Sequence, residues 1–496
     1  MTSPKADAAR SGSAAKKRTN GLDSFFKITE RGSTVPREIR GGLVTFFTMA
    51  YIVVLNPLIL GGAKDAGGHQ LDLGQLTTST ALVAAVMTLL MGVWGRYPFA
   101  IAAGLGLNAV VAFQLASRMS WADAMGLVVL EGLLITLLVA TGLRQAIMDA
   151  IPLALKQSIS VGIGLFIAFI GLVDAGFVRR VPDAANTVVP VELGIGNRLM
   201  GWPTLVFCLG LLLTVVLVAL RLRGAILLSI VATTIFAIVV NAIADVPPRV
   251  DAAGHVTPTG WGLTVPRLPH SLVGSPDFGL VGQFSLGGGF AEVGVLVAAL
   301  FVFTLMLSDF FDTMGTVIGV GNEAGLLDRD GRLPGIGNVL LVDSLAAAAG
   351  GAASCSSNTT YIESAAGVGE GARTGLASVV TALLFVVALF LTPLVEVVPY
   401  EAASPVLVVV GFLLMVQVRD IPWGDLDLAL PAFLTIVLMP FTFSITNGIG
   451  AGFITYVVIK AVKGRWSEPG PLMWVIALAF VVYFAIDPIE RLLGIG

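Results

Sequence analysis

Two aspartates end a long apolar run in the second half of the chain, within the stretch LSDFFDTMGT at residues 307–316. The run starts near Val293 and carries no charge before Asp309. Asp309 and Asp312 lie three residues apart, so they share one face of a helix. A carboxylate at the centre of a membrane helix costs about 2.5–3.5 kcal/mol, which makes both aspartates functional candidates.

Three more acidic residues lie within apolar segments, whereas the histidines all lie in hydrophilic loops. No Lys or Arg lies near the middle of those segments to pair with them. A buried carboxylate without a neighbouring cation can hold a proton, a metal ion or the N–H donors of a ligand. The three residues are Glu131, Asp343 and Glu363.

Each acidic residue also has a purely structural explanation. Asp309 can cap a neighbouring broken helix, and Glu131 and Asp343 can hydrogen-bond across helices. Glu363 lies where an irregular segment becomes helical, so it can act as a helix N-terminal carboxylate. We expect Asp312 and Glu363 to contact a ligand directly, and we leave the other three open.

The composition indicates that these segments lie in a membrane. Of the 496 residues, 56% are hydrophobic and only 12% are charged, about half the charged fraction of a soluble protein. Successive apolar stretches are long enough to cross a bilayer, so the sequence predicts an all-α polytopic membrane protein. The two cysteines indicate no disulfide framework. Residues 1–20 are basic and lack an apolar core, so they are not a signal peptide.

The apolar segments predict fourteen membrane crossings and one additional segment, 472–490, which can span the membrane or lie on its surface. Lys and Arg gather at the ends that a cytoplasmic N-terminus would place inside the cell, except in the loop 179–198. The predicted crossings are 41–61, 76–94, 98–114, 121–143, 158–175, 203–221, 224–244, 293–316, 335–350, 353–367, 374–392, 402–418, 428–445 and 448–462.

An internal repeat relates the two halves of the chain. TFFTMAYIVVLNP (45–57) aligns without gaps on FVFTLMLSDFFDT (301–313). This alignment places Asn56 on Asp312. Chance similarity between apolar segments is the alternative explanation.

A second pair of segments supports the repeat. IPLALKQSISVGIGLF (151–166) aligns on VPYEAASPVLVVVGFL (398–413), which places Gly164 on Gly411. Each half holds an odd number of crossings, so a genuine repeat must be inverted in the membrane. Inverted repeats are a common plan of secondary transporters.

Two of the crossings are poor helices. PFAIAAGLGLNAVVAF (98–113) opens with proline and contains Gly104 and Gly106, and GGAASCSSNTTYIESAAGVG (350–369) is small and polar for half its length. Irregular backbone at membrane depth is stable only where it is buried in protein or lines a cavity. These segments are third in each half, and corresponding interrupted segments indicate a binding site near the midplane.

Other chemistries find little support in the sequence. There is no G-x-x-x-x-G-K-[ST] phosphate loop and no H-E-x-x-H motif. A membrane-embedded enzyme would need a base for a nucleophile near Ser354, Cys355 and Glu363, and no histidine is available there. An anion carrier would bind its ligand at helix N-termini, but two acidic groups in the pocket would repel an anion.

The motifs around these residues resemble a known family. PFAIAAGLGLNA, SISVGIGLFIAFIGL, FFDTMGTVIGVGNEAGLLD and TTYIESAAGVGEGARTGL are similar to the adenine–guanine–hypoxanthine permease branch of the nucleobase–ascorbate transporter superfamily, which also contains xanthine/uracil permeases. The resemblance extends from about Gly21 to Gly464. FDTMGT and TTYIESAAG are quite specific to that branch.

The resemblance implies a 7+7 inverted repeat with core and gate domains. Crossings 3 and 10 would pair as short strands that lead into half-helices, and the substrate would lie between them, facing the gate. The implied segments are a cytoplasmic N-terminal tail (1–40), the core domain (41–143 and 291–392), the gate domain (144–244 and 393–463), an extracellular loop (245–290) and an extra C-terminal apolar segment (464–496).

The resemblance also implies which residues form the site. Asp312 and Glu363 match the carboxylates that hold the purine, and Phe99 matches the aromatic residue that stacks on the base. A purine offers ring N–H donors and a flat face, which suit these side chains. Backbone amides near Ala100 and Ser364 would complete the site. Weaker contributions are expected from Thr313, Asn56 and Asn108.

Some positions depart from the pattern of the family. A proline is expected at Ala103, a methionine at Leu105 and an aromatic residue near Val110. The approach to TTYIESAAG normally reads more like GTSTV, whereas here it is SCSSN. These positions surround the expected pocket, so they bear on which purine is preferred.

These features predict a secondary active importer of purine nucleobases (hypoxanthine, guanine and/or adenine) that uses an elevator-type mechanism. The expected location is the plasma membrane, with a cytoplasmic N-terminus and a homodimeric assembly. A proton is the expected co-transported ion, carried by Asp312 or Glu363 together with Asp309, because no histidine lies in the membrane. No cofactor, metal or nucleic-acid partner is expected. The main alternative is a uracil or xanthine permease of the same fold, followed by an anion carrier.

Overall fold

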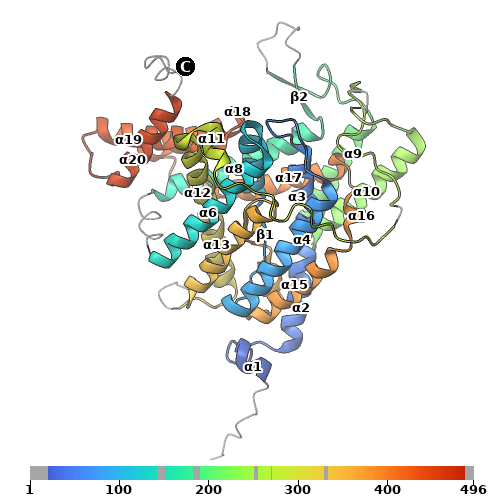
Figure 1. Ribbon diagram of the computed structural model, residues 1–496, viewed down its shortest axis with the longest axis horizontal. Coiled ribbons are helices and arrows are strands. Elements are labelled where there is room, and N and C mark those ends of the chain that lie inside the picture. The colour runs from blue at the N-terminus through green and yellow to red at the C-terminus, as the bar shows by residue number, and fades with distance from the viewer. Residues whose placement is uncertain are drawn as a thin grey trace, which may run out of the picture.

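The computed structural model describes residues 21–142, 151–181, 190–250, 255–269, 271–328 and 333–485. The molecule is built almost entirely from helices that lie side by side (Figure 1). Helix α1 (Gly21–Phe26) lies at one end, and the C-terminal helix α20 (Pro471–Phe484) lies beside α19 (Ile445–Val462) at the other. The predicted basic tail at residues 1–20 lies outside the described residues.

Nine helices within the described ranges are long and apolar enough to cross a membrane, and four shorter apolar helices accompany them. The first half contains α2 (Val35–Met49), α3 (Ile52–Gly62), α4 (Leu73–Leu90), α5 (Leu105–Val110), α6 (Trp121–Thr141), α8 (Leu153–Asp174), α9 (Trp202–Ala219) and α10 (Ala225–Ala244). The second half contains α11 (Gly288–Val293), α12 (Val295–Glu323), α13 (Ile336–Ala352), α14 (Ser364–Gly369), α15 (Gly375–Ala388), α16 (Thr392–Val395), α17 (Tyr400–Met415), α18 (Leu426–Phe441) and α19.

Each predicted crossing coincides with one or more of these elements, although the boundaries differ. Helix α2 begins at Val35, inside the segment predicted as a tail, because Pro36 occupies its first turn, where the fixed backbone angle of proline favours helix initiation. The additional C-terminal segment forms α20, which packs on α19. There the rings of Phe453 and Phe480 meet edge to face, with their centroids 6.2 Å apart.

The third and tenth crossings contain short strands, as predicted. Strand β1 (Ile101–Ala103) pairs antiparallel with β4 (Asn358–Thr360), and Ala102 lies opposite Thr359 at the centre of the ladder. The half-helices α5 and α14 follow these strands. A second small sheet pairs β2 (Val178–Arg180) with β3 (Val191–Leu193) in the loop after α8.

Side chains satisfy the backbone of the central strands where the ladder ends. Ile101 N donates to Thr88 Oγ1 at 2.9 Å, and the same hydroxyl donates to Ile101 O at 3.0 Å. Gly104 N extends the pairing by donating to Ser357 O at 2.9 Å. Unpaired backbone groups are costly inside a membrane, so these bonds allow an irregular segment to lie there.

Helices α8 and α17 cross at two glycines that are equivalent in the predicted repeat. A Cβ atom on Gly411 would lie 2.4 Å from the carbonyl oxygen of Gly164, and one on Gly164 would lie 2.6 Å from that of Gly411. Only glycine permits this approach of the two backbones. Equivalent residues that contact each other reciprocally lie on a two-fold axis. The contact therefore supports the register of the inverted repeat.

Candidate functional site

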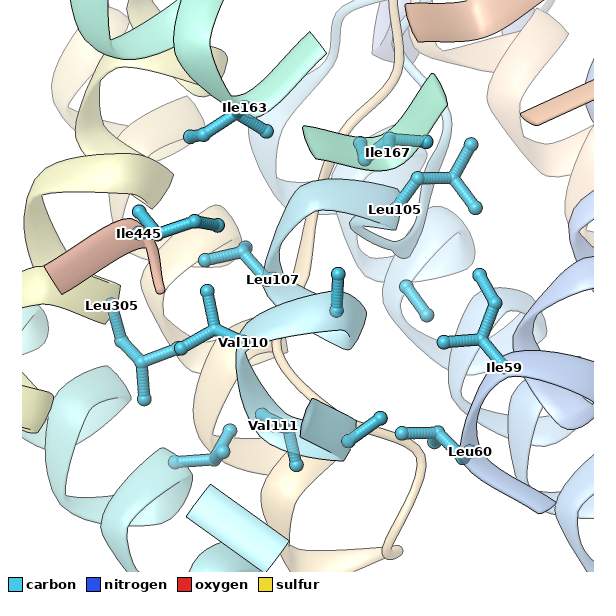
Figure 2. Close-up of a cluster of buried hydrophobic side chains, with 14 of the residues drawn as sticks. Ile59, Leu60, Leu105, Leu107, Val110, Val111, Ile163, Ile167, Leu305 and Ile445 are labelled. Carbon is cyan, nitrogen blue, oxygen red and sulfur yellow. The ribbon is translucent and has the colours of Figure 1, made fainter. Parts of the chain in front are cut away.

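A cavity lies beside the paired strands. On one side it is lined by the break between α2 and α3, by the segments that follow β1 and β4, and by the middle of α12. On the other side it is lined by α8 and α17. Figure 2 shows half-helix α5 among residues of α3, α8 and α12, with Leu105 and Leu107 on the same side as Ile163 and Ile167 of α8.

The structure brings Asp312 and Glu363 to this one cavity. Asp312 comes from the middle of α12, and its side chain is exposed there. Glu363 comes from the turn between β4 and α14 and is partly exposed. Among the residues that the structure describes, no Lys, Arg or His belongs to the cavity lining. The cavity therefore offers hydrogen-bond acceptors and negative charge without a compensating cation.

Two tyrosines that the sequence analysis did not assign also line the cavity. The Tyr51 hydroxyl donates to Glu363 Oε1, and the Tyr361 hydroxyl donates to Ala103 O at 2.5 Å. Their ring centroids lie 6.5 Å apart, and the rings are tilted by 48°. Both residues lie inside the motifs quoted above. A tyrosine in an apolar crossing beside an interrupted segment is a signal that could have drawn attention to them.

Asp343 connects the two elements that carry the cavity carboxylates. Its Oδ2 atom accepts a hydrogen bond from Thr313 Oγ1 at 2.6 Å. Its Oδ1 atom accepts from Thr360 N at 2.8 Å and from Thr360 Oγ1 at 2.7 Å. Thr313 follows Asp312 in α12, but it faces Asp343 rather than the cavity. Asp343 thus ties α12 to strand β4.

Three further predicted residues lie behind the cavity lining. Asp309 and Asn108 are fully buried, and neither lines the cavity. Asn56 is also fully buried, and its Nδ2 atom donates to Thr80 Oγ1 at 2.8 Å and to Cys355 O at 3.1 Å. The Asn56 bonds join α3 to α4 and to the irregular segment before β4. The structure thus gives Asn56 a supporting position and leaves the role of Asp309 as a prediction.

Phe99 is not brought to the cavity in this structure. It is fully buried, and its ring stacks on Tyr97 with centroids 5.5 Å apart and an angle of 9°. Alternate residues of an extended segment point to opposite faces, and Phe99 and Ile101 pack in one apolar cluster while Ala100 and Ala102 pack in another. The alternation therefore turns the Phe99 ring away from the carboxylates.

The backbone amides expected to complete the site already have partners. Ala100 N donates to Ser364 Oγ at 3.0 Å, and Ser364 N lies 3.2 Å from Tyr361 O, to which it donates. Ala100 and Ser364 are both buried outside the cavity lining. In this structure they join β1 to α14 beneath the site. A ligand contact at these amides stays a prediction.

Glu131 is placed apart from the two cavity carboxylates. It is fully buried in α6, where its Oε2 atom accepts a hydrogen bond from Ser357 Oγ at 3.1 Å. This bond joins α6 to the segment that leads into β4, so the interhelical explanation considered for Glu131 matches its position.

The comparisons with known proteins find permeases. The model of a permease family matches residues 36–451. Guanine/hypoxanthine permease PbuO of Bacillus subtilis is 39% identical over 465 residues, which cover 92% of this chain and 99% of that protein. Adenine permease AdeP of Escherichia coli is 36% identical over 469 residues, which cover 93% of this chain and 95% of that protein.

The chain is therefore a multi-pass membrane transporter and not an enzyme. It belongs to the permease family that residues 36–451 match, in agreement with the resemblance drawn from its motifs.

Solved structures confirm the fold. One is the transmembrane domain of the cyanobacterium bicarbonate transporter BicA. The match covers 84% of this chain and 97% of the BicA chain, with a TM-score of 0.56 and 14% identity. Another is the murine anion transporter Slc26a9 in its inward-facing state. The match covers 93% of this chain and 77% of the Slc26a9 chain, with a TM-score of 0.59 and 12% identity. At these identities the likeness concerns the fold alone, which is the predicted 7+7 inverted repeat.

Proposed function

We propose that the chain is a secondary active importer of purine nucleobases. The observation that carries the proposal is the meeting of Asp312 and Glu363 in one cavity without a cation. A neutral purine presents ring N–H groups that carboxylates accept, and its flat faces suit the Tyr51 and Tyr361 rings nearby. The relatives PbuO and AdeP are named as guanine/hypoxanthine and adenine permeases, which supports this substrate class.

The position of the cavity supports an elevator-type mechanism. One wall comes from the segments assigned above to the core domain, and the other comes from α8 and α17 of the assigned gate domain. A ligand held mainly by the core can change sides if the core moves against the gate. We propose this division, with the boundaries given from the sequence, together with a homodimer, a plasma-membrane location and a cytoplasmic N-terminus.

Proton coupling is the part of the proposal that follows from charge. Asp312 interacts electrostatically with Glu363 and with Asp343, and like charges at short range favour the binding of a proton. Asp312 and Glu363 are the two carboxylates that the cavity reaches. Asp309, one helical turn from Asp312, is retained as a third proton site.

The experiment is uptake of labelled hypoxanthine, adenine, guanine, uracil and xanthine into cells that express the chain, each with and without an uncoupler. Saturable purine uptake that the uncoupler abolishes is the expected result. Uptake of uracil or xanthine alone would favour the alternative permease. Purine uptake that is unaffected by the uncoupler but requires sodium would overturn proton coupling. The proposal that the substrate is a purine would still stand.

An anion carrier is the second class that the fold permits, since BicA and Slc26a9 are named as bicarbonate and anion transporters. The two acidic side chains in the cavity argue against it, because an anion there would meet like charge. Uptake of labelled bicarbonate or chloride without purine uptake would reverse this preference.

A further inference from the structure

The two cavity carboxylates differ in what the protein offers them. Glu363 Oε1 accepts a hydrogen bond from the Tyr51 hydroxyl. No hydrogen bond reaches the Asp312 side chain from the part of the chain that the structure describes. The cavity therefore contains one carboxylate whose orientation the protein fixes and one that is free to turn toward a ligand.

The local structure explains why Tyr51 reaches Glu363. Helix α2 ends at Met49 and α3 begins at Ile52, so Tyr51 lies in the break between them. The turn is tight, since Val54 N donates to Tyr51 O at 3.0 Å. Pro57 lacks an N–H for the carbonyl of Val53, which weakens the helix beyond the break. Tyr51 keeps helical backbone angles, and its carbonyl also accepts from Leu55 N at 2.9 Å, so its side chain projects from the first turn of α3.

The burial of Tyr51 makes this hydrogen bond specific. Only 2% of the residue is exposed, so its hydroxyl cannot exchange Glu363 freely for water. The neighbouring ring of Tyr361 is anchored separately by its own bond to the Ala103 carbonyl. The two tyrosines are thus matched in type and location, but only the Tyr51 hydroxyl contacts a carboxylate.

We propose that Tyr51 is a positioning residue for purine binding: it holds Glu363 Oε1 so that Oε2 is presented to the substrate. The inference rests on the proposed function, because it concerns how that substrate is held. With Oε1 committed to Tyr51, Glu363 offers one oriented acceptor to a ring N–H. Asp312 supplies the second acceptor from α12, on the same side of the cavity. A carboxylate held in advance loses less conformational freedom on binding, so it strengthens affinity more than the rate of transport.

The test compares Tyr51→Phe with Tyr361→Phe, each of which removes one hydroxyl from the same cavity. Labelled hypoxanthine binding to the purified protein gives Kd, and uptake into proteoliposomes gives KM and the maximal rate per molecule. Tyr51→Phe should raise Kd and KM about tenfold, the effect of losing a hydrogen bond to a charged group. Its maximal rate should stay within about twofold of wild type. Tyr361→Phe removes a hydroxyl that contacts no carboxylate, so it should raise KM much less than Tyr51→Phe does.

A double-mutant cycle separates an effect through Glu363 from a general disturbance of the cavity. If Tyr51 acts only through this carboxylate, adding Tyr51→Phe to Glu363→Gln should weaken purine binding much less than it does in wild type. Thermal unfolding of each purified variant shows whether the fold is retained. A Tyr51→Phe variant that unfolds is replaced by Tyr51→His, which keeps a donor and should restore affinity.

Several outcomes would overturn the inference. Wild-type KM in Tyr51→Phe, an equal rise of KM in Tyr361→Phe, or full additivity with Glu363→Gln would each remove the positioning role and leave purine transport intact. Failure of the unmodified chain to bind or transport any purine would instead overturn the proposed function, and this inference with it.

Discussion

Replacing Asp312 by asparagine tests the proposed site directly, because Asn has nearly the same shape and lacks the charge. Asp309 provides a matched control. It is the same residue type one helical turn earlier, but it is fully buried and outside the cavity lining. Asp312→Asn and Asp309→Asn therefore remove the same charge from the same helix at two places that differ in access to the cavity.

The size of the effect follows from the surroundings of Asp312. Its side chain is exposed in the cavity, and the described residues donate no hydrogen bond to it. The substitution therefore breaks no bond within the protein, and its effect should fall on the ligand. Loss of a charge-assisted hydrogen bond costs about 1.5–3 kcal/mol, which weakens purine binding by roughly 10- to 150-fold. Removal of one negative charge near Glu363 and Asp343 should leave the fold as stable as before or more so.

The assays are uptake of labelled hypoxanthine at matched surface expression, equilibrium binding to the purified protein, and thermal unfolding. Asp312→Asn should nearly abolish uptake, weaken binding by the stated factor and keep the unfolding temperature. Asp309→Asn should retain saturable binding. Normal binding by Asp312→Asn would refute the assignment of the site. An equal loss of affinity in Asp309→Asn would show that purine binding depends on negative charge anywhere on this face of α12, and not on direct contact between Asp312 and the ligand.

Three further predictions concern the scaffold. Phe99→Ala should lower the free energy of unfolding by about 3–5 kcal/mol through the cavity it creates, with KM unchanged in uptake; a rise in KM would instead support stacking of the base on Phe99. Gly411→Ala should destabilise the purified protein by about 1–3 kcal/mol, because its Cβ would meet the Gly164 carbonyl; unaltered thermal unfolding would contradict the close crossing. In the loop after α3, burial opposes ionisation, but N–H donors from His69 and Trp121 lower the pKa of Asp65 below its ordinary value. Its stabilising effect is complete above the ordinary value of about 3.9 and is lost as the pH falls through the lower folded-state pKa. Asp65→Asn should therefore be less stable at neutral pH and show a flatter acid limb in thermal unfolding.

The architecture was largely predictable from the sequence. Apolar segments of sufficient length predicted the crossings, and glycine, proline and small polar residues marked the two that contain strands. These inferences depend on local chemistry, which one chain is enough to reveal. The pairing of Asp312 with Glu363 was implied instead by the family resemblance, because Asp312 lies in an uninterrupted helix.

The side-chain contacts of the site were not predictable in the same way. Phe99 and Ala100 are adjacent in sequence, but the alternation of the extended segment before β1 places them in two different apolar clusters, and neither lines the cavity. Tyr51 and Glu363 come from opposite halves of the chain, and their hydrogen bond depends on how α3 packs against the turn after β4. Such contacts follow from tertiary geometry, which the periodicity and composition of a sequence do not predict.

The repeat itself explains why the site is asymmetric. Asn56 and Asp312 are equivalent positions in the aligned halves. In α3 the amide bonds to Thr80 and to the Cys355 carbonyl, so it is used inside the protein. In α12 the carboxylate faces the cavity. The Asn56 amide donates to two partners within the scaffold, whereas an unpaired carboxylate in a membrane needs a ligand or a proton. The two halves of the inverted repeat are thus similar scaffolds. The half that carries Asp312 in place of an asparagine is the one that presents an acidic side chain to a ligand.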